Sequence, residues 1–297
     1  MKWMTVFDFD SKQKFVSYEI VHQTTYSYEH KKRSSVMTVC MQPKATSWQF
    51  LDHYQLATTP ESMIDIDVDP FGNTRHFFDI HRPHNKLTVT SNARVRSHFN
   101  EAGDVADHDD WSALAKLHTK LDFWDFLLPT DLTRTKSDLD RWTDHQGGID
   151  KSSPWLFLKS LEQRLSEVIR YRPGATSIDS TVDDLLRHHE GVCQDISQLM
   201  IAIARSKGIP ARYVSGYLYV APNATRRLVD NATHAWVECY LPSKGWCTFD
   251  PTNPQGAPET RVTVAYGRDY RDVPPIRGIT FGEGEAVMDV SVMVFRQ

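Results

Sequence analysis

The stretch GVCQDISQLM, residues 191–200, places a cysteine at the start of an apolar helix. One stripe of apolar residues recurs there at helical spacing: Ile196, Leu199, Met200, Ile203 and Ala204. This spacing predicts a buried helix from Cys193 to about Arg205. Gly208 and Pro210 follow it and are typical of a helix end. The stretch therefore predicts a thiol in the first turn of a buried helix.

The position of Cys193 has a chemical consequence. The first turn of a helix leaves backbone N–H groups unpaired and carries the positive end of the helix dipole, and both features stabilise a thiolate. We expect the small residue Gly191 to let another segment approach the sulfur. The alternative is a cysteine that only fills space in the core, which is a common role for a lone buried cysteine.

A nucleophilic thiolate needs a base, and the base needs an orienting group. Residues 233–240, THAWVECY, alternate as a strand, residues 241–245, LPSKG, form a turn, and residues 246–250, WCTFD, form the returning strand. If the loop is 241–245, Tyr240 pairs with Trp246 and the rest of the register follows.

This register places Asp250 diagonal to His234 on the same face of the hairpin, within reach of its imidazole. A slip of one residue would move Asp250 to the opposite face. The same register sets Cys239 opposite Cys247, and we expect two free thiols there in a reducing compartment. Taken alone, His234 would more often be a structural histidine.

Four blocks carry a family resemblance: GVCQDISQLM (191–200), GIPARYVSGYLYV (208–220), THAWVECYLPSKGW (233–246) and FDPTN (249–253). Together they resemble the transglutaminase-like superfamily in its bacterial branch, over about residues 155–255. The β-rich region before them resembles the N-terminal domain of bacterial members. The resemblance implies a papain-like core, with helices packed on an antiparallel sheet and the nucleophile at a helix N-terminus. It also implies roles for Cys193 as nucleophile, His234 as general base and acid, and Asp250 as the orienting carboxylate.

The resemblance implies an acyl-transfer enzyme that acts on amide bonds of proteins or peptides through a thioester. The backbone N–H of Cys193 is the expected first donor to the oxyanion, and Trp155 is a candidate for the second. Tyr217 and Trp236 are candidates for a substrate groove, although all three aromatic residues also suit a core position. Water or a primary amine could resolve the thioester, and we expect water. A non-catalytic binding module with the same fold is the competing hypothesis.

The pattern along the chain predicts an α+β protein. Alternating strands in the first hundred residues predict an N-terminal antiparallel β-sandwich or barrel-like domain over 1–129, with a trailing helix at 111–128. We expect a polar linker at 130–153 and the catalytic core at 154–297, where a helix begins at Pro154.

Composition restricts the partners. The formal net charge of −4 argues against a general nucleic-acid or anionic-membrane binder. No run approaches the ~20 apolar residues of a membrane span, and no signal peptide is recognisable. Only 4 cysteines occur among 297 residues, without a metal-ligand or disulfide pattern. We therefore expect a cytoplasmic protein without a cofactor, and the sequence does not predict its oligomeric state.

No metal site is expected. Residues 65–69, DIDVD, imitate the start of an EF-hand loop, but Pro70 replaces its glycine and His76 replaces its last glutamate. An alternating strand with a solvated acidic face explains this segment better. His188 and His189 lack the spacing of a zinc site and suit the end of a helix.

Overall fold

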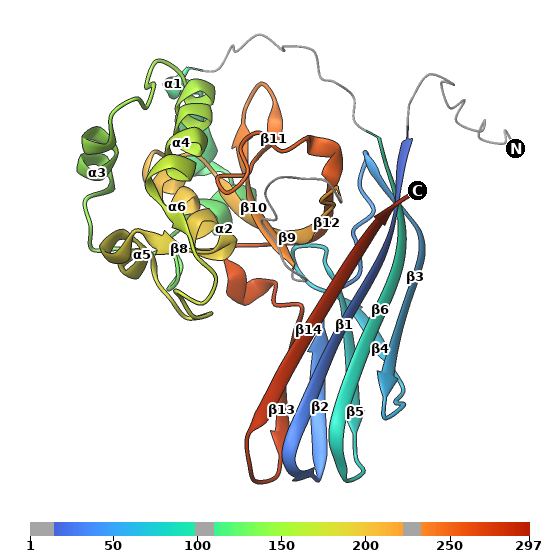
Figure 1. Cartoon of the computed structure of the whole chain (residues 1–297). Helices are drawn as coiled ribbons and strands as arrows, with labels where there is room; N and C mark the ends of the chain where they lie inside the picture. Colours follow the sequence, from blue (N-terminus) through green and yellow to red (C-terminus); the bar gives the residue numbers. More distant parts are fainter. Residues whose placement is uncertain (1–14, 99–109, 222–232) are drawn as a thin grey trace, which may run out of the picture.

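The computed structural model describes residues 15–98, 110–221 and 233–297. Its strands and helices form a long β-sandwich beside a mixed helix-and-sheet core (Figure 1). One sheet of the sandwich has the strand order β14 (Ala286–Arg296), β1 (Phe15–Lys32), β6 (His84–His98), β3 (Gln49–Thr59). The other has the order β13 (Ile276–Phe281), β2 (Ser34–Val39), β5 (Thr74–Ile80), β4 (Asp65–Val68). The predicted α+β class with an N-terminal antiparallel sandwich is confirmed.

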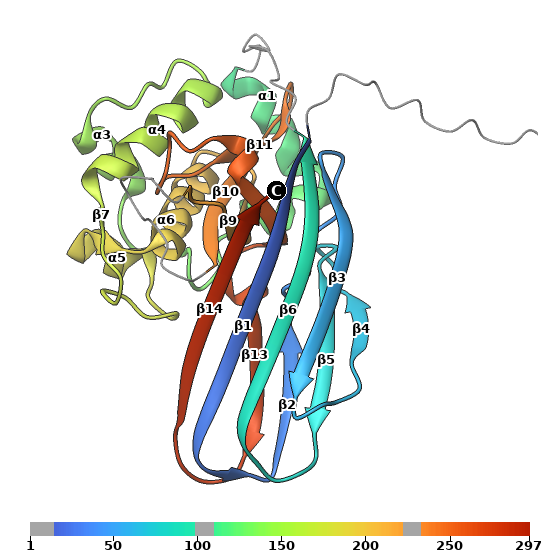
Figure 2. The same ribbon diagram turned by 45° about the vertical axis from the view of Figure 1, so that its right-hand side comes forward.

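The two sheets of the sandwich lie face to face (Figure 2). Alternate side chains of β1, β2, β5 and β6 point between them, as strand periodicity requires. They form one cluster of buried residues: Tyr28, Met37, Val39, Met41, Phe78, Ile80, Leu87 and Val89. This packing explains why the first hundred residues alternate so regularly.

The C-terminal strands correct the predicted domain boundaries. We expected residues 154–297 to belong to the core, yet β14 pairs with β1 from Tyr18↔Arg296 to Tyr28↔Ala286, and β13 pairs with β2. The last strands of the chain therefore complete the sandwich that its first strands begin. An alternating strand pattern fixes which residues face inward but not which distant strand is the partner.

The segment after the sandwich also differs from its prediction. In place of one helix over 111–128, the structure has short pieces: α1 (Trp111–Ala115), η1 (Lys116–Thr119), η2 (Leu121–Phe123) and α2 (Trp124–Leu127). Lys120 is extended (φ −99°, ψ 119°) and interrupts the helix. The predicted linker contains a further helix, α3 (Leu139–Gln146), whose N-cap residue Asp138 accepts a hydrogen bond from the Arg141 N–H.

These pieces contact the core through α3 with α6 and α2 with β9, and Phe126 of α2 also meets Phe71 of the sandwich, with ring centroids 5.8 Å apart. Leu114, Leu117 and Leu139 belong to the same buried cluster as the apolar residues of the cysteine-bearing helix. The apolar side chains of Leu114 and Leu117, which precede the predicted boundary at residues 129 and 130, therefore share a buried cluster with elements that follow it.

The core consists of an antiparallel sheet covered by helices (Figure 1). The sheet has the order β11 (Gly245–Phe249), β10 (His234–Leu241), β9 (Ala211–Leu218), β12 (Arg261–Gly267). Helix α6 (Cys193–Ser206) packs on β9 and β10, and contacts α4 (Pro154–Val168) and α5 (Val182–His188). A short parallel pair, β7 (Arg170–Tyr171) and β8 (Glu190–Gly191), leads into α6.

Helix α6 begins and ends where the sequence predicts. Its residues 195–205 are all buried, since the helix is enclosed by the sheet and by the other helices. At its N-terminus Asp195 accepts a hydrogen bond from the Val192 N–H (2.8 Å) and another from the Thr176 hydroxyl (2.6 Å). A Cβ on Gly191 would lie 2.9 Å from the Asp195 carboxylate and 2.8 Å from Leu185. The small size of Gly191 therefore accommodates these two residues, and its predicted role in letting another segment approach the sulfur stays a prediction.

Two amide side chains of the sandwich close the outer edge of the core sheet. Gln49 exchanges hydrogen bonds with the backbone of Thr263 on β12 (N–H to Oε1 2.8 Å, Nε2 to O 2.8 Å). Asn73 does the same with Tyr266 (N–H to Oδ1 2.8 Å, Nδ2 to O 2.7 Å). Each amide makes the two hydrogen bonds that a neighbouring strand would make. The backbone N–H and C=O groups of Thr263 and Tyr266 on β12 are therefore paired although they are buried.

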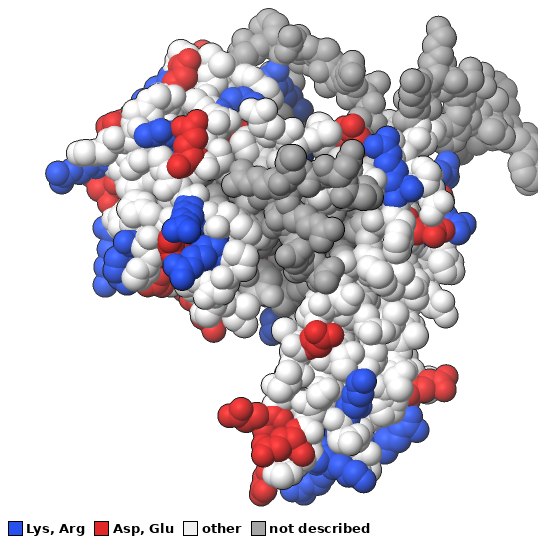
Figure 3. Space-filling model, viewed as in Figure 1, with Lys and Arg blue, Asp and Glu red and all other residues white. Residues whose placement is uncertain are grey.

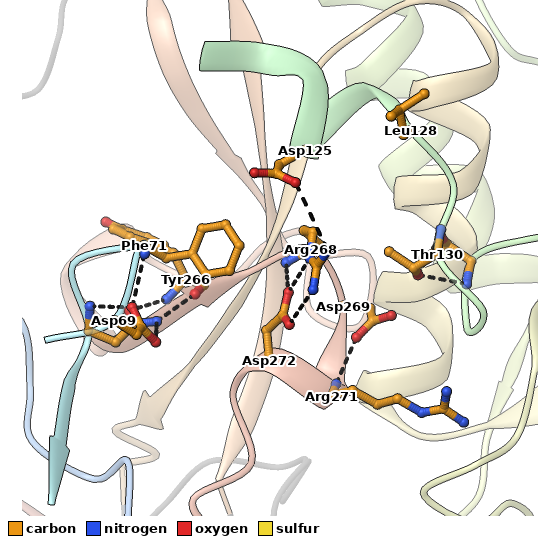
Figure 4. A network of polar contacts seen from close by, with 12 residues as sticks. Asp69, Phe71, Asp125, Leu128, Thr130, Tyr266, Arg268, Asp269, Arg271 and Asp272 are labelled. Atoms are coloured by element: carbon orange, nitrogen blue, oxygen red, sulfur yellow. Dashed lines mark hydrogen bonds and ion pairs between the residues drawn. The ribbon is translucent and has the colours of Figure 1, made fainter. Parts of the chain in front are cut away.

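A polar network joins the two parts of the molecule beside this edge (Figure 4). Asp69 ends its strand by accepting from the Phe71 N–H (2.9 Å) and from Arg75 Nε (2.9 Å). Arg75 also donates to the Asp272 carbonyl, and the Asp272 carboxylate receives Arg268 through two nitrogens at 2.8 and 3.0 Å. Asp69 thus has an interface role, in addition to the solvated role predicted for its strand.

Charged side chains of both signs are interspersed over the described face shown in Figure 3. Within the described ranges, no group of three or more His, Cys, Asp or Glu residues could hold a metal ion. In the same ranges, no helix is both long enough and apolar enough to cross a membrane.

Replacing Gly216 with alanine should destabilise the core strongly. A Cβ at this position on β9 would overlap the Val262 backbone oxygen and the indole of Trp236, and a backbone oxygen held in a ladder cannot move aside. We expect the free energy of unfolding to fall by about 1–3 kcal/mol in chemical denaturation, as for an overpacked core. Thr248→Ala, on an exposed position of β11, should change it by less than about 0.5 kcal/mol.

Candidate active site

The three predicted catalytic residues come from separate elements of the core. Cys193 is the first residue of α6, and 9% of its surface is exposed. His234 is the first residue of β10, and Asp250 directly follows β11. The site therefore forms where the N-terminus of a buried helix meets one end of the antiparallel sheet.

The imidazole and the carboxylate are in direct contact. His234 Nε2 lies 2.8 Å from Asp250 Oδ2, and both side chains are fully buried. The hairpin has the predicted register, with Tyr240 opposite Trp246, and this register brings the two side chains to the same face. The prediction from loop length is confirmed at this point.

Asp250 is held from several sides. Its Oδ1 accepts hydrogen bonds from the backbone N–H groups of Thr252 (3.2 Å) and Asn253 (3.1 Å). Arg261 Nε lies 3.7 Å from the other oxygen. Burial raises the pKa of Asp250, but the charges of His234 and Arg261 and the hydrogen bonds outweigh it and hold this pKa below its usual range. Asp250 is therefore a fixed carboxylate at neutral pH.

The electrostatics of His234 link it to Cys193. Burial lowers the pKa of this imidazole, but Asp250 and then Cys193 outweigh burial and raise the pKa to about 10. Because Cys193 contributes to this rise, its sulfur lies close to the imidazole ring. His234 Nδ1 is buried and has no hydrogen-bond partner among the described residues. Because Nε2 is engaged by Asp250, Nδ1 is the nitrogen that remains to exchange a proton with the sulfur.

Three further residues near the site were not predicted from the sequence. Arg261 lies beside Asp250, and Glu162 of α4 accepts a hydrogen bond from the Asp250 backbone N–H (2.6 Å). Tyr213 of β9 is buried, and burial followed by the nearby Cys193 raises its pKa well above the usual value. No local pattern marks these residues, because each reaches the site only through the packing of distant elements.

The aromatic residues predicted to bind substrate lie mainly in the core. Tyr217 and Trp236 are each 1% exposed. The Tyr217 hydroxyl lies 3.1 Å from His22 Nδ1 of the sandwich, and Trp236 packs with Val214. Both side chains therefore have packing roles, and a contact with substrate stays a prediction.

Trp155 is half-buried on α4, with its ring centroid 5.7 Å from that of Phe249 and with Lys244 Nζ 5.0 Å from its own centroid. Its predicted role as an oxyanion donor also stays a prediction. Cys239 and Cys247 lie opposite each other as predicted, and no disulfide bond joins them.

Comparison with known proteins identifies the family. Residues 146–251 match the model of the transglutaminase-like superfamily, and residues 18–96 match the bacterial transglutaminase-like N-terminal region. An uncharacterised protein of Mycobacterium leprae is 32% identical over 279 residues, which cover 93% of this chain and 98% of that protein. The chain belongs to the transglutaminase-like superfamily. The family predicted from the four sequence blocks is confirmed.

Two further similar proteins carry names that state an activity. A crystal structure of a proposed cysteine protease from Cytophaga hutchinsonii has a TM-score of 0.76 and 19% identity, covering 95% of this chain and 91% of that chain. At this identity the likeness shows the fold alone. A protein-glutamine gamma-glutamyltransferase of Pseudomonas aeruginosa is 37% identical over 114 residues, which cover 36% of this chain and 17% of that protein.

Proposed function

We propose that this protein is a cysteine-dependent acyl-transfer enzyme that acts on amide bonds of proteins or peptides. The observation that carries the proposal is the buried His234–Asp250 pair beside a cysteine at the N-terminus of a buried helix. Membership of the transglutaminase-like superfamily supports the same chemistry. In this proposal Cys193 is the nucleophile, His234 transfers protons and Asp250 orients the imidazole.

The reaction begins when the Cys193 thiolate forms a bond to the carbonyl carbon of the amide. The tetrahedral intermediate carries a negative oxygen, and the backbone N–H groups at the start of α6 are suited to stabilise it. His234, protonated at Nδ1, gives this proton to the leaving nitrogen as the C–N bond breaks. The products of this half are a free amine and a thioester on Cys193.

The second half releases the acyl group. A water molecule or a primary amine attacks the thioester carbon while the neutral His234 takes its proton. The intermediate collapses and expels the thiolate, which restores the thiolate and the imidazolium. Water gives hydrolysis and an amine gives cross-linking. The similarity to a protein-glutamine gamma-glutamyltransferase of Pseudomonas aeruginosa favours a glutamine amide as the acyl donor.

A labelling experiment distinguishes this enzyme from a binding module with the same fold. The native protein is treated with limiting iodoacetamide near neutral pH, and the labelled cysteine is located by mass spectrometry. We expect Cys193 to react ahead of Cys40, Cys239 and Cys247. The thiols of Cys40 and Cys239 are buried, and burial raises their pKa. Equal or absent labelling of Cys193 would favour the binding module.

A second experiment identifies the acceptor. A glutamine-bearing peptide is incubated with the protein, with and without a primary amine, and the product masses are compared. Conversion of the glutamine to glutamate, or cleavage of the peptide, indicates water as the acceptor. A mass increase equal to the added amine less ammonia indicates amine transfer. An unchanged peptide in a broad substrate panel would contradict the proposed function.

A further inference from the structure

Glu162 is a buried carboxylate for which the proposed reaction has no use. It lies on α4 and is 3% exposed. Its Oε1 accepts the Asp250 backbone N–H at 2.6 Å, and its Oε2 accepts Lys159 Nζ at 2.5 Å. Burial raises the pKa of Glu162, and Lys159 and the Asp250 N–H oppose that rise. Because burying a carboxylate is costly, both of its oxygens have partners.

The surrounding contacts direct one face of α4 toward the end of β11. Trp155, Lys159 and Glu162 follow each other at helical spacing. Trp155 packs against the Phe249 ring, the Lys159 ammonium lies 5.7 Å from the centroid of that ring, and Glu162 binds the next residue, Asp250. Helix α4 therefore contacts both the last residue of β11, Phe249, and the backbone of the next residue, Asp250.

We propose that Glu162 is a positioning residue that fixes the Asp250 main chain and thereby the His234–Asp250 hydrogen bond. The inference rests on the proposed function, because the pair matters only where His234 transfers protons. The two ends of Asp250 are held separately: Glu162 holds its backbone N–H, and the N–H groups of Thr252 and Asn253 hold its Oδ1. Only Oδ2 is left for the imidazole, so the direction of that hydrogen bond is set by Glu162 and the turn together.

Charge balance gives Glu162 a second effect on the same pair. The ionisable groups that surround His234 and Glu162 are Cys193 from α6, Asp250 after β11, Arg261 from β12, Lys159 from α4 and the neutral thiol Cys239 from β10. The carboxylates of Glu162 and Asp250 balance the positive charges of Lys159 and Arg261. An imidazolium at His234 paired with a thiolate at Cys193 therefore leaves the cluster neutral. Loss of the Glu162 charge leaves one cation in excess and disfavours the imidazolium.

The test uses two variants and a matched control in the full-length protein. Glu162→Gln keeps an oxygen that can accept the Asp250 N–H but removes the charge, whereas Glu162→Ala removes both. Glu167→Gln removes a charge from the exposed face of the same helix, where Glu167 contacts Gln163 and Arg164. The readouts are the His234 imidazole titration by NMR, assigned with His234→Gln, and kcat and KM for a small glutamine peptide.

We expect Glu162→Ala to lower kcat by at least about tenfold with KM changed less than about twofold, because a displaced general acid slows chemistry and not binding. The His234 pKa should fall by about one unit or more. Glu162→Gln should restore kcat to within about threefold of the wild type while its His234 pKa stays lowered. Glu167→Gln should match the wild type in every readout.

A folded Glu162→Ala protein with unchanged kcat and an unchanged His234 titration would overturn the proposal. Equal loss of kcat in both variants, without a change of the His234 pKa, would also overturn it and indicate a role in stability alone. The His234 titration can be measured in a protein without enzyme activity. The proposed role of Glu162 and the proposed acyl-transfer function can therefore be contradicted independently. A shifted His234 pKa in a protein that transfers no acyl group would support positioning and contradict the proposed function.

Discussion

Cys193→Ala should abolish acyl transfer, with a loss of about 10⁴–10⁶-fold in kcat/KM, as for removal of a nucleophile that acts as one unit with its base. The sulfur begins α6 in a buried site beside His234, and none of the residues around it can replace its bond to the acyl carbon. The measurement is the rate of product release from a glutamine peptide. Folding should be intact, because alanine suits a first helical turn and removes only one atom.

Cys247→Ala is the control for this experiment. Cys247 is half-buried and lies on the hairpin that carries Asp250, so its removal tests whether any cysteine near the site is sufficient. We expect its kcat/KM to stay within about twofold of the wild type, as for a substitution outside the chemistry. Persistent turnover in Cys193→Ala, above the level of a heat-inactivated sample, would contradict a role of Cys193 as nucleophile.

Asp250→Asn should lower kcat by about 10²–10⁴-fold, because an asparagine can hold the imidazole in the wrong tautomer and cannot stabilise its charged form. The His234 side chain is fully buried and its pKa of about 10 depends first on the Asp250 charge working against burial. Without that charge, burial dominates and lowers the His234 pKa, so the imidazolium is lost at neutral pH.

The pH profile gives the sign of this effect. In the proposed mechanism the active form carries a proton on His234, so in the wild type kcat/KM should be sustained into the alkaline range and fall as the pH rises through about 10. In Asp250→Asn that alkaline limb should move toward neutral pH. The free energy of unfolding depends on pH in the same direction. The stabilisation that comes from the raised His234 pKa is fully present below pH ~6.5 and is lost as the pH rises through the pKa of about 10 in the folded protein.

Asp289→Asn provides the comparison, since Asp289 is an exposed residue on β14. It removes the same charge from the chain and should leave both kcat and the alkaline limb unchanged. An alkaline limb that stays in place in Asp250→Asn would contradict the assignment of the limb to His234. Urea denaturation of the wild type and of Asp250→Asn at pH 6 and pH 10 tests the stability effect.

The local features of the site could be predicted from the sequence. The apolar stripe of α6 placed Cys193 in a first helical turn, and the structure begins the helix at that residue. The length of the 241–245 loop placed Asp250 on the face of His234, and the observed register agrees. Both predictions depend on the geometry of short segments, in which the spacing of residues along the chain determines where their side chains point.

The surroundings of the site could not be predicted in this way. Glu162 reads in the sequence as an ordinary helix residue, yet it binds the backbone of Asp250, which lies 88 positions later. Gln49 is bound to Thr263 across 214 positions. The single helix predicted over 111–128 is not formed. Its apolar residues instead reach the core from several short helical pieces, and this arrangement depends on tertiary packing.

The sequence by itself determined which residues begin α6, how the His234–Asp250 hairpin is paired and which family the chain resembles. Only the tertiary structure decided that the last strand pairs with the first, that the amides of Gln49 and Asn73 close the edge of β12, and that Glu162 reaches the backbone of Asp250. Helix periodicity and hairpin register are local, because hydrogen bonds between near neighbours fix them. The choice of a distant partner depends on the shape and burial of the whole molecule, and many alternating strands or polar side chains satisfy the same local rule.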